Sequence, residues 1–150
     1  MAGYGITTEI IIEATPHKVW SILLDFPAYP QWNPFILSVS GTPRPGSRLH
    51  VCIQPGERRT TTFRPNVLQV SDGQTLRWRG HLGIPGFFDG EHFFELIALG
   101  DEGTRFIQGE NFSGLFAGLI FPSMKAATAT GFKAMNQALK QRAETSHTLP

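Results

Sequence analysis

The feature that most constrains the fold is a series of short strand-like segments that ends in one long amphipathic helix. The segments are rich in β-branched and aromatic residues, and short breaks containing Gly, Pro or Asp separate most of them. Breaks of this kind favour hairpins and therefore antiparallel pairing. The seven expected strands cover residues 6–14, 35–40, 48–54, 60–70, 75–81, 88–99 and 104–112. Pro65 interrupts the fourth of these, which predicts an edge strand or a bulge.

Two short helices and one long helix are expected beside these strands. Thr15 followed by Pro16 is typical of an N-cap and a first helical position, and the helix should end near residues 26–27. A second helical turn is expected over residues 28–32. The long helix is predicted over residues 122–143, where apolar and small residues recur on one face. That face carries Met124, Ala127, Thr128, Gly131, Phe132, Met135 and Leu139.

A helix with one apolar face must bury that face against another layer, which here can only be the sheet. Twist accumulates across seven strands, so the sheet should curve around the helix. We therefore predict an α+β fold in a single domain over residues 1–150. It has a curved seven-stranded antiparallel sheet around a long C-terminal helix, and a cavity where sheet and helix do not close on each other.

The composition narrows the possible functions. The chain has 12 Phe and 3 Trp but only 2 Tyr, and this aromatic surface fits either a Phe-rich core or an aromatic-lined cavity. A net charge of +1 without a basic stripe argues against a nucleic-acid partner. The single cysteine, Cys52, and the scattered histidines give no support to a metal site, and no cofactor motif is present.

The distribution of apolar residues also bears on location. No stretch approaches the ~20 apolar residues that a membrane-spanning helix needs. The N-terminus lacks a cationic start followed by an apolar run, so we expect no signal peptide. The sequence therefore predicts a cytoplasmic protein without an integral membrane segment, and it leaves the oligomeric state open.

Several short motifs, in this element order, resemble the START-like or polyketide cyclase superfamily (SRPBCC), whose helix-grip fold is shared with the pollen-allergen proteins. The motifs are ATPHKVW at 14–20, YPQWNPF at 29–35, LRWRG at 76–80, GIPGFF at 83–88, DGEH at 89–92 and ENFSG at 110–114. The resemblance spans residues 6–143 and implies a hydrophobic pocket. It does not imply one reaction, because the superfamily includes aromatase/cyclases, lipid carriers and hormone receptors.

Strand alternation selects the candidate polar residues of such a pocket. In 104–112, Gln108 and Glu110 share a face with two phenylalanines, so this face should point inward. His92 lies on the corresponding face of 88–99. A carboxylate among aromatic rings is costly unless it is paired or protonated. Glu110 is therefore either a general acid or base, with His92 as its catalytic partner, or one member of a structural pair.

The remaining candidates are ligand contacts. They are Trp32, Phe35, Trp78, Phe94, Phe106, Gln108, Phe112 and Phe132, and Trp32 is expected to close one end of the cavity. The apolar segments 82–88 and 115–121 are expected to be loops that form a lid, a dimer surface or packed ends.

The sequence is compatible with three alternative functions. The first is a binding module for a small hydrophobic or aromatic molecule, such as a lipid or a polyketide-like compound. The second is a cyclase or dehydratase that uses the same cavity, with Glu110 or His92 moving protons. The third is an interaction domain whose exposed apolar loops bind another protein.

Overall fold

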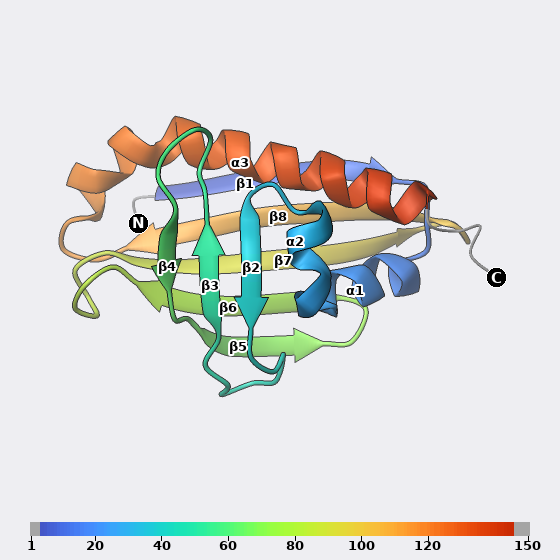
Figure 1. The fold of residues 1–150 in the computed structure, drawn as a ribbon, viewed down its shortest axis with the longest axis horizontal. Coiled ribbons are helices and arrows are strands. Elements are labelled where there is room, and N and C mark those ends of the chain that lie inside the picture. The colour runs from blue at the N-terminus through green and yellow to red at the C-terminus, as the bar shows by residue number, and fades with distance from the viewer. Residues whose placement is uncertain (1–3, 146–150) are drawn as a thin grey trace.

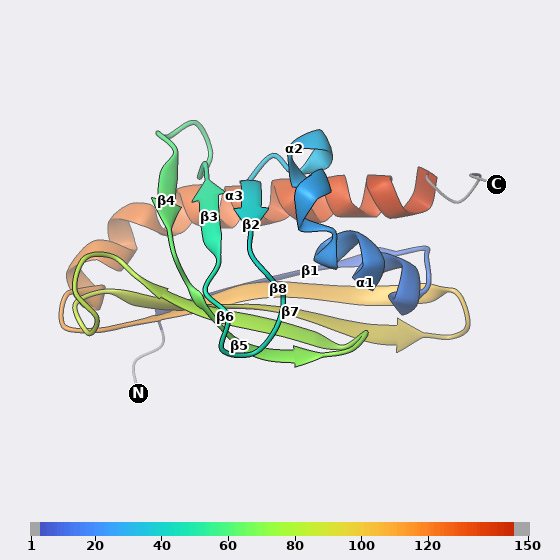
Figure 2. The same ribbon diagram turned by 60° about the horizontal axis from the view of Figure 1, so that its bottom comes forward.

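A long C-terminal helix, α3 (Ala117–Thr145), lies across one face of a five-stranded antiparallel sheet (Figures 1 and 2). The computed structural model describes residues 4–145. The order of strands in the sheet is β1–β8–β7–β6–β5. Their bounds are β1 (Tyr4–Ile12), β5 (Asn66–Ser71), β6 (Thr75–His81), β7 (Asp89–Leu99) and β8 (Gly103–Ser113).

A second sheet of three strands lies on the same side of the five-stranded sheet as α3, beside the helix (Figure 2). It consists of β2 (Ile36–Ser40), β3 (His50–Ile53) and β4 (Thr61–Phe63), in the order β2–β3–β4. Residues 4–145 thus form eight strands in two sheets, and the predicted single sheet of seven strands is wrong. The curved antiparallel arrangement around the C-terminal helix is confirmed (Figure 1).

Pro65 explains the difference in strand number. The predicted strand 60–70 is two strands, because β4 pairs with β3 in one sheet and β5 pairs with β6 in the other. Pro65 lies between them and has no N–H to donate to a ladder, although its carbonyl oxygen accepts a hydrogen bond from Leu49 N at 2.8 Å. The chain therefore changes sheets at this residue.

The two short helices follow β1, with a 3-10 turn at Phe26–Ala28 between them. Helix α1 (Pro16–Leu24) begins as predicted, because the Thr15 side chain accepts a hydrogen bond from Lys18 N at 3.2 Å. Helix α2 (Tyr29–Trp32) is a single turn. The buried Tyr29 hydroxyl donates to Leu23 O at 2.6 Å.

Helix α3 begins at Ala117, five residues before the predicted start at residue 122. Pro122 therefore lies inside the helix, where it cannot donate to the carbonyl group of Gly118. A proline at such a position bends a helix, and Figure 2 shows the N-terminal turns of α3 inclined to the rest. Most of the segment predicted as the loop 115–121 is consequently the first part of this helix.

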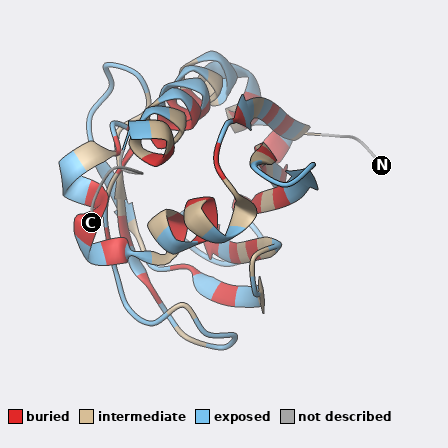
Figure 3. Ribbon diagram, turned by 90° about the vertical axis from the view of Figure 1, so that its right-hand side faces the viewer, coloured by how far each residue is buried: buried red, intermediate tan, exposed pale blue. Residues whose placement is uncertain are grey.

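The apolar face of α3 packs into the core as predicted. Phe132, Met135 and Leu139 are fully buried, and Figure 3 shows buried and exposed positions alternating along the strands and the helix. The ring of Phe132 lies 5.3 Å from the ring of Phe35, which precedes β2. A Cβ atom at Gly131 would overlap the Phe35 ring, so glycine at this position allows the second sheet to approach α3.

Candidate functional site

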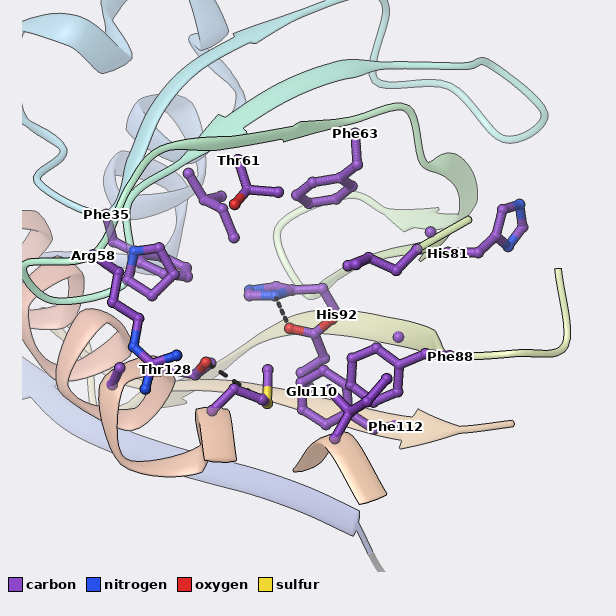
Figure 4. Close-up of a pocket in the computed structure, with 18 of the residues that line it drawn as sticks. Phe35, Arg58, Thr61, Phe63, His81, Phe88, His92, Glu110, Phe112 and Thr128 are labelled. Carbon is purple, nitrogen blue, oxygen red and sulfur yellow. Dashed lines mark hydrogen bonds and ion pairs between the residues drawn. The ribbon is translucent and has the colours of Figure 1, made fainter. Parts of the chain in front are cut away.

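A cavity of about 530 Å³ lies between the five-stranded sheet, the β3–β4 hairpin and α3 (Figure 4). Its walls are mostly apolar, and their aromatic side chains are Phe35, Phe63, Trp78, Phe88 and Phe112. The polar side chains that reach it include the inward pair expected from the sequence, His92 and Glu110.

Two glycines in neighbouring strands line the cavity. Gly80 in β6 and Gly90 in β7 are directly paired in the sheet, and both line the cavity. They occupy the inward face, where Trp78 and His92 stand two residues further along. A Cβ atom at Gly80 would lie 3.0 Å from the Phe63 ring. These two glycines were not predicted as site residues, although glycine at the inward positions of neighbouring strands is a signal that alternation could have supplied.

Glu110 points inward, as the alternation predicted. It lies directly opposite His92 in the β7–β8 ladder, and His92 lies opposite Trp78 in the β6–β7 ladder. Glu110 Oε1 is 3.3 Å from His92 Nδ1, the contact drawn dashed in Figure 4. The His92 side chain is 5% exposed and stacks on Trp78, whereas the Glu110 side chain is 18% exposed. Of the pair, the carboxyl group is thus the more accessible from the cavity.

A buried chain of hydrogen bonds continues behind His92. His92 Nε2 lies 2.9 Å from Gln108 Oε1, and Gln108 Nε2 donates to Asn136 Oδ1 at 2.8 Å. Asn136 Nδ2 in turn donates to Thr8 Oγ1 at 2.8 Å. Neither Thr8 nor Asn136 was predicted from the sequence as a site residue. Two features of the sequence could have indicated them: Thr8 lies at an inward position of β1, and Asn136 follows Met135 on the apolar face of α3.

The predicted site residues fall into two groups. Phe35, Trp78 and Phe112 line the cavity together with His92 and Glu110. The others are not among its lining residues: Phe94, Phe106 and Phe132 are fully buried in the core, Gln108 belongs to the hydrogen-bond chain, and Trp32 packs on Tyr29.

Trp32 does not close the cavity as expected. Its ring lies 5.2 Å from the ring of Tyr29. Helix α2, which carries it, lies on the other side of β2 from β3 and β4 (Figure 1), whereas the cavity is bounded by the β3–β4 hairpin. Arg58 and Arg59 of that hairpin line the cavity. From the sequence, these two arginines were considered only as a cluster of positive charge.

Arg58 joins the β3–β4 hairpin to α3. Its Nη2 atom donates to Ser123 O at 2.8 Å, and Gln54 Nε2 donates to Arg58 O at 3.1 Å. Arg58 and Arg59 are both exposed and both line the cavity, so they form part of its rim. The rim is therefore cationic on the side of the hairpin.

Asp89 anchors the β6–β7 loop, which lies at another side of the cavity. Its Oδ1 atom accepts a hydrogen bond from Gly86 N at 3.0 Å, and Arg79 Nη2 lies 3.0 Å from its Oδ2 atom. Burial by itself would raise the pKa of Asp89. The Gly86 N–H, Arg79 and His81 outweigh burial and hold the pKa below its ordinary value. The ionised carboxylate therefore fixes the loop.

The same loop contributes to an exposed apolar patch. The loop is joined to the start of α3 by the hydrogen bonds Leu115 N to Gly86 O and Phe116 N to Phe87 O, each 2.8 Å long. Leu115 is 74% exposed, whereas Phe88 and Phe121 in the same two segments are buried. The three expected uses of these segments, a lid, a dimer surface or packed ends, therefore stay predictions. The patch consists of Leu82, Ile84, Phe87, Leu115, Phe116 and Leu119.

Residues 4–145 contain neither a cluster of potential metal ligands nor a helix that could span a membrane. In that part of the chain, no group of three or more His, Cys, Asp or Glu side chains could hold a metal ion. None of the helices described there is long and apolar enough to cross a membrane.

A curved antiparallel sheet that grips a long C-terminal helix beside a largely apolar cavity defines the helix-grip class of proteins. Residues 5–144 match the family described as polyketide cyclase/dehydrase and lipid transport, so the chain belongs to that family. No curated protein matches the sequence.

Solved structures share the fold. A START superfamily protein from Mycobacterium smegmatis is 21% identical with a TM-score of 0.76, and the match covers 97% of this chain and 99% of that one. The Zhui aromatase/cyclase from Streptomyces sp. R1128 is 19% identical with a TM-score of 0.73, covering 95% and 94%. Norcoclaurine synthase from Thalictrum flavum is 13% identical with a TM-score of 0.74, covering 98% of each chain. At these identities the similarity concerns the fold alone.

Proposed function

We propose that this protein binds a small hydrophobic or aromatic molecule, lipid-like or polyketide-like, in the cavity. The observation that carries the proposal is the cavity itself. A space of about 530 Å³ with mostly apolar walls and a few convergent polar groups is typical of ligand sites, which span roughly 300–1,000 Å³. The family description, which includes lipid transport, supports the same function.

The direct test is native mass spectrometry of gently purified protein, combined with titration of N-phenyl-1-naphthylamine, a neutral apolar fluorophore. Two neighbouring alanines of α3 provide a matched pair of variants. Ala127 lines the cavity, whereas Ala126 is exposed. Ala127→Phe should fill part of the cavity and weaken binding about tenfold or more, while Ala126→Phe should leave binding unchanged. If neither the fluorophore nor a copurified lipid is bound, the proposal fails.

A second candidate function is a cyclase or dehydratase that uses Glu110 to move protons. The observation in its favour is a carboxyl group at the cavity wall, backed by a buried histidine that is itself hydrogen-bonded. The test is turnover of a polyketide-like substrate. Glu110→Gln should abolish turnover while binding of the apolar fluorophore persists. A bound ligand that is released unchanged, with no turnover of any substrate offered, would favour the binding function alone.

Three expectations from the sequence remain predictions and accompany this proposal. They are the cytoplasmic location, the lack of a nucleic-acid partner and the direct contact of Phe35, Trp78 and Phe112 with the ligand. The proposal assigns no ligand contact to five of the predicted residues, because they do not line the cavity: Trp32, Phe94, Phe106, Gln108 and Phe132. The exposed apolar patch supports either a lid over the cavity or an interaction surface.

A further inference from the structure

The hydrogen-bond chain behind His92 can be satisfied in one direction only. The chain ends on two backbone carbonyl groups, Gln108 O and Phe132 O, and a carbonyl oxygen can only accept a hydrogen bond. Thr8 Oγ1 donates its single proton to Gln108 O at 2.9 Å, so it must accept from the Asn136 side chain. Asn136 therefore presents its oxygen to Gln108, and the Gln108 amide nitrogen donates to it and approaches Phe132 O at 3.5 Å.

This direction fixes the protonation of one nitrogen of His92. Because the Gln108 amide nitrogen donates to Asn136, the side-chain oxygen of Gln108 faces His92 Nε2, at 2.9 Å. Nε2 must then carry a hydrogen, since two acceptors would otherwise face each other in a buried site. Reversing the chain would leave Thr8 without a proton for Gln108 O, so the reverse orientation loses a buried hydrogen bond.

The other nitrogen of His92 faces Glu110. Nδ1 and Glu110 Oε1 are 3.3 Å apart, and without a proton between them two lone pairs would oppose each other. One proton removes this conflict whether it resides on Nδ1, giving an imidazolium and a carboxylate, or on Oε1, giving neutral partners. Both ring nitrogens are then engaged, so His92 positions Glu110 and does not itself contact a ligand through a nitrogen.

The second carboxyl oxygen of Glu110 is left for the ligand. A Cβ atom at Gly90 would overlap Oε2, which shows that Oε2 lies over this cavity-lining glycine. No residue of the described chain donates a hydrogen bond to Oε2. Because the shared proton lies on the Oε1 side in either form, Oε2 carries no hydrogen and can only accept.

We propose that Glu110 and His92 share one proton at the Nδ1–Oε1 contact, held there by Gln108, Asn136 and Thr8. The unprotonated Oε2 then accepts a hydrogen bond from a hydroxyl group on an otherwise apolar ligand. This inference rests on the proposed binding function and narrows its ligand class to apolar molecules that carry a hydroxyl, such as phenols. The three residues behind His92 are positioning residues, since they act through the imidazole ring.

The proton arrangement is tested by NMR of protein labelled in the imidazole nitrogens and the glutamate carboxyl carbons, at neutral pH. We expect His92 Nε2 to be protonated, with one proton shared between Nδ1 and the Glu110 carboxyl group. A His92 that carries its proton on Nδ1 with Nε2 bare would overturn the proposal. So would an ionised Glu110 facing an unprotonated Nδ1.

Gln108→Met tests the positioning role, because it removes the acceptor of Nε2 while keeping the length of the side chain. The NMR signal of the His92 Nε2 hydrogen should then shift, because this hydrogen has lost its acceptor. Asn111→Met is the matched control, since Asn111 is exposed on the outer face of the same strand and should leave the His92 signals unchanged. An unaltered His92 spectrum in Gln108→Met would contradict the positioning role. The measurement on the unsubstituted protein remains decisive even if this variant does not fold.

The ligand class is tested with two aromatic molecules that differ at one group, 2-naphthol and 2-methoxynaphthalene. The protein should bind 2-naphthol about tenfold or more tightly than the ether, which cannot donate a hydrogen bond. Glu110→Met should abolish this preference. Glu110→Gln should keep it, because its amide nitrogen can donate to His92 Nδ1 and leave its oxygen toward the cavity.

The outcomes separate this inference from the function on which it rests. Equal affinity of the unsubstituted protein for 2-naphthol and the ether would overturn the hydroxyl inference and leave the binding function intact. If neither molecule binds and the neutral fluorophore also fails to bind, the binding function itself is wrong.

Discussion

Gly90 leaves open the space in which the carboxyl group of Glu110 lies. A Cβ atom at Gly90 would overlap Glu110 Oε2 and would lie 3.2 Å from Glu110 Cδ. The two residues belong to neighbouring strands, β7 and β8, and are offset by two positions, since Gly90 pairs with Phe112 and Glu110 pairs with His92. The position of the only carboxyl group that lines the cavity among the described residues thus depends on the absence of a side chain next to it.

Gly90→Ala should therefore displace the Glu110 carboxyl group and break its contact with His92. The overlapped atom is the far end of a flexible side chain, so we expect displacement instead of unfolding. The measurement is a double-mutant cycle by urea denaturation. In a Glu110→Ala background the substitution should cost about 1 kcal/mol less than in the unsubstituted protein. Equal costs in the two backgrounds would show that Gly90 and Glu110 do not interact.

Ligand binding should quench the fluorescence of Trp78 and leave that of Trp32 unchanged. Trp78 lines the cavity, whereas Trp32 packs on Tyr29 away from it. The check is a titration with a nitroxide-labelled fatty acid, which quenches at short range. Trp78→Phe should remove most of the quenching, and Trp32→Phe should preserve it. Quenching that persists in Trp78→Phe and disappears in Trp32→Phe would place the bound molecule elsewhere.

Phe132→Ala should lower the free energy of unfolding by about 3–5 kcal/mol, the usual cost of removing a buried phenylalanine ring. Phe132 is fully buried and contacts both Phe35 and His92, at ring distances of 5.3 and 5.0 Å. Lys133→Ala is the control, because Lys133 is exposed and should change stability by less than about 0.5 kcal/mol. A loss below about 1 kcal/mol for Phe132→Ala would mean that α3 contributes little to the core.

Asp89 should stabilise the protein at neutral pH and lose this contribution in acid. Its pKa is lower in the folded protein than its ordinary value, so the contribution is complete above the unfolded pKa of about 3.9. It is lost as the pH falls through the lower folded pKa. Asp89→Asn should therefore be less stable at pH 7, and its difference from the unsubstituted protein should shrink in acid.

The measurement for Asp89 is chemical denaturation from pH 7 to about pH 2.5. Asp101→Asn, in the exposed turn between β7 and β8, is the control and should change stability by less than about 0.5 kcal/mol at each pH. A destabilisation by Asp89→Asn that stays constant across this range would show that the charge of Asp89 is not what holds the β6–β7 loop.

The inward faces of β7 and β8 were predictable from the sequence. Successive side chains of a strand point to opposite faces, so the inward direction of Gln108 and Glu110 followed from their alternation with two phenylalanines. The same local rules predicted Thr15 as an N-cap and the apolar face of α3. These features depend on residues a few positions apart, and the sequence displays such spacings directly.

Other features depend on contacts between distant parts of the chain. Thr8 and Gln108 are 100 residues apart and meet only because β1 pairs with β8. The change of sheets at Pro65 was also hidden, because a proline can equally mark an edge or a bulge within one strand.

The sequence alone therefore determined the order of the elements apart from the division of 60–70 into two strands, the family resemblance, and the inward faces of β7 and β8. Tertiary structure decided which inward residues border open space and which are buried in the core. Phe112 lines the cavity while Phe106, on the same face of β8, does not. The physical reason is the β6–β7 register, which sets Gly80 beside Gly90 at the cavity, whereas the rings of Phe94 and Phe106 stack on each other in the core. Alternation gives direction along one strand, but the space above a residue depends on the residues that neighbouring strands bring beside it.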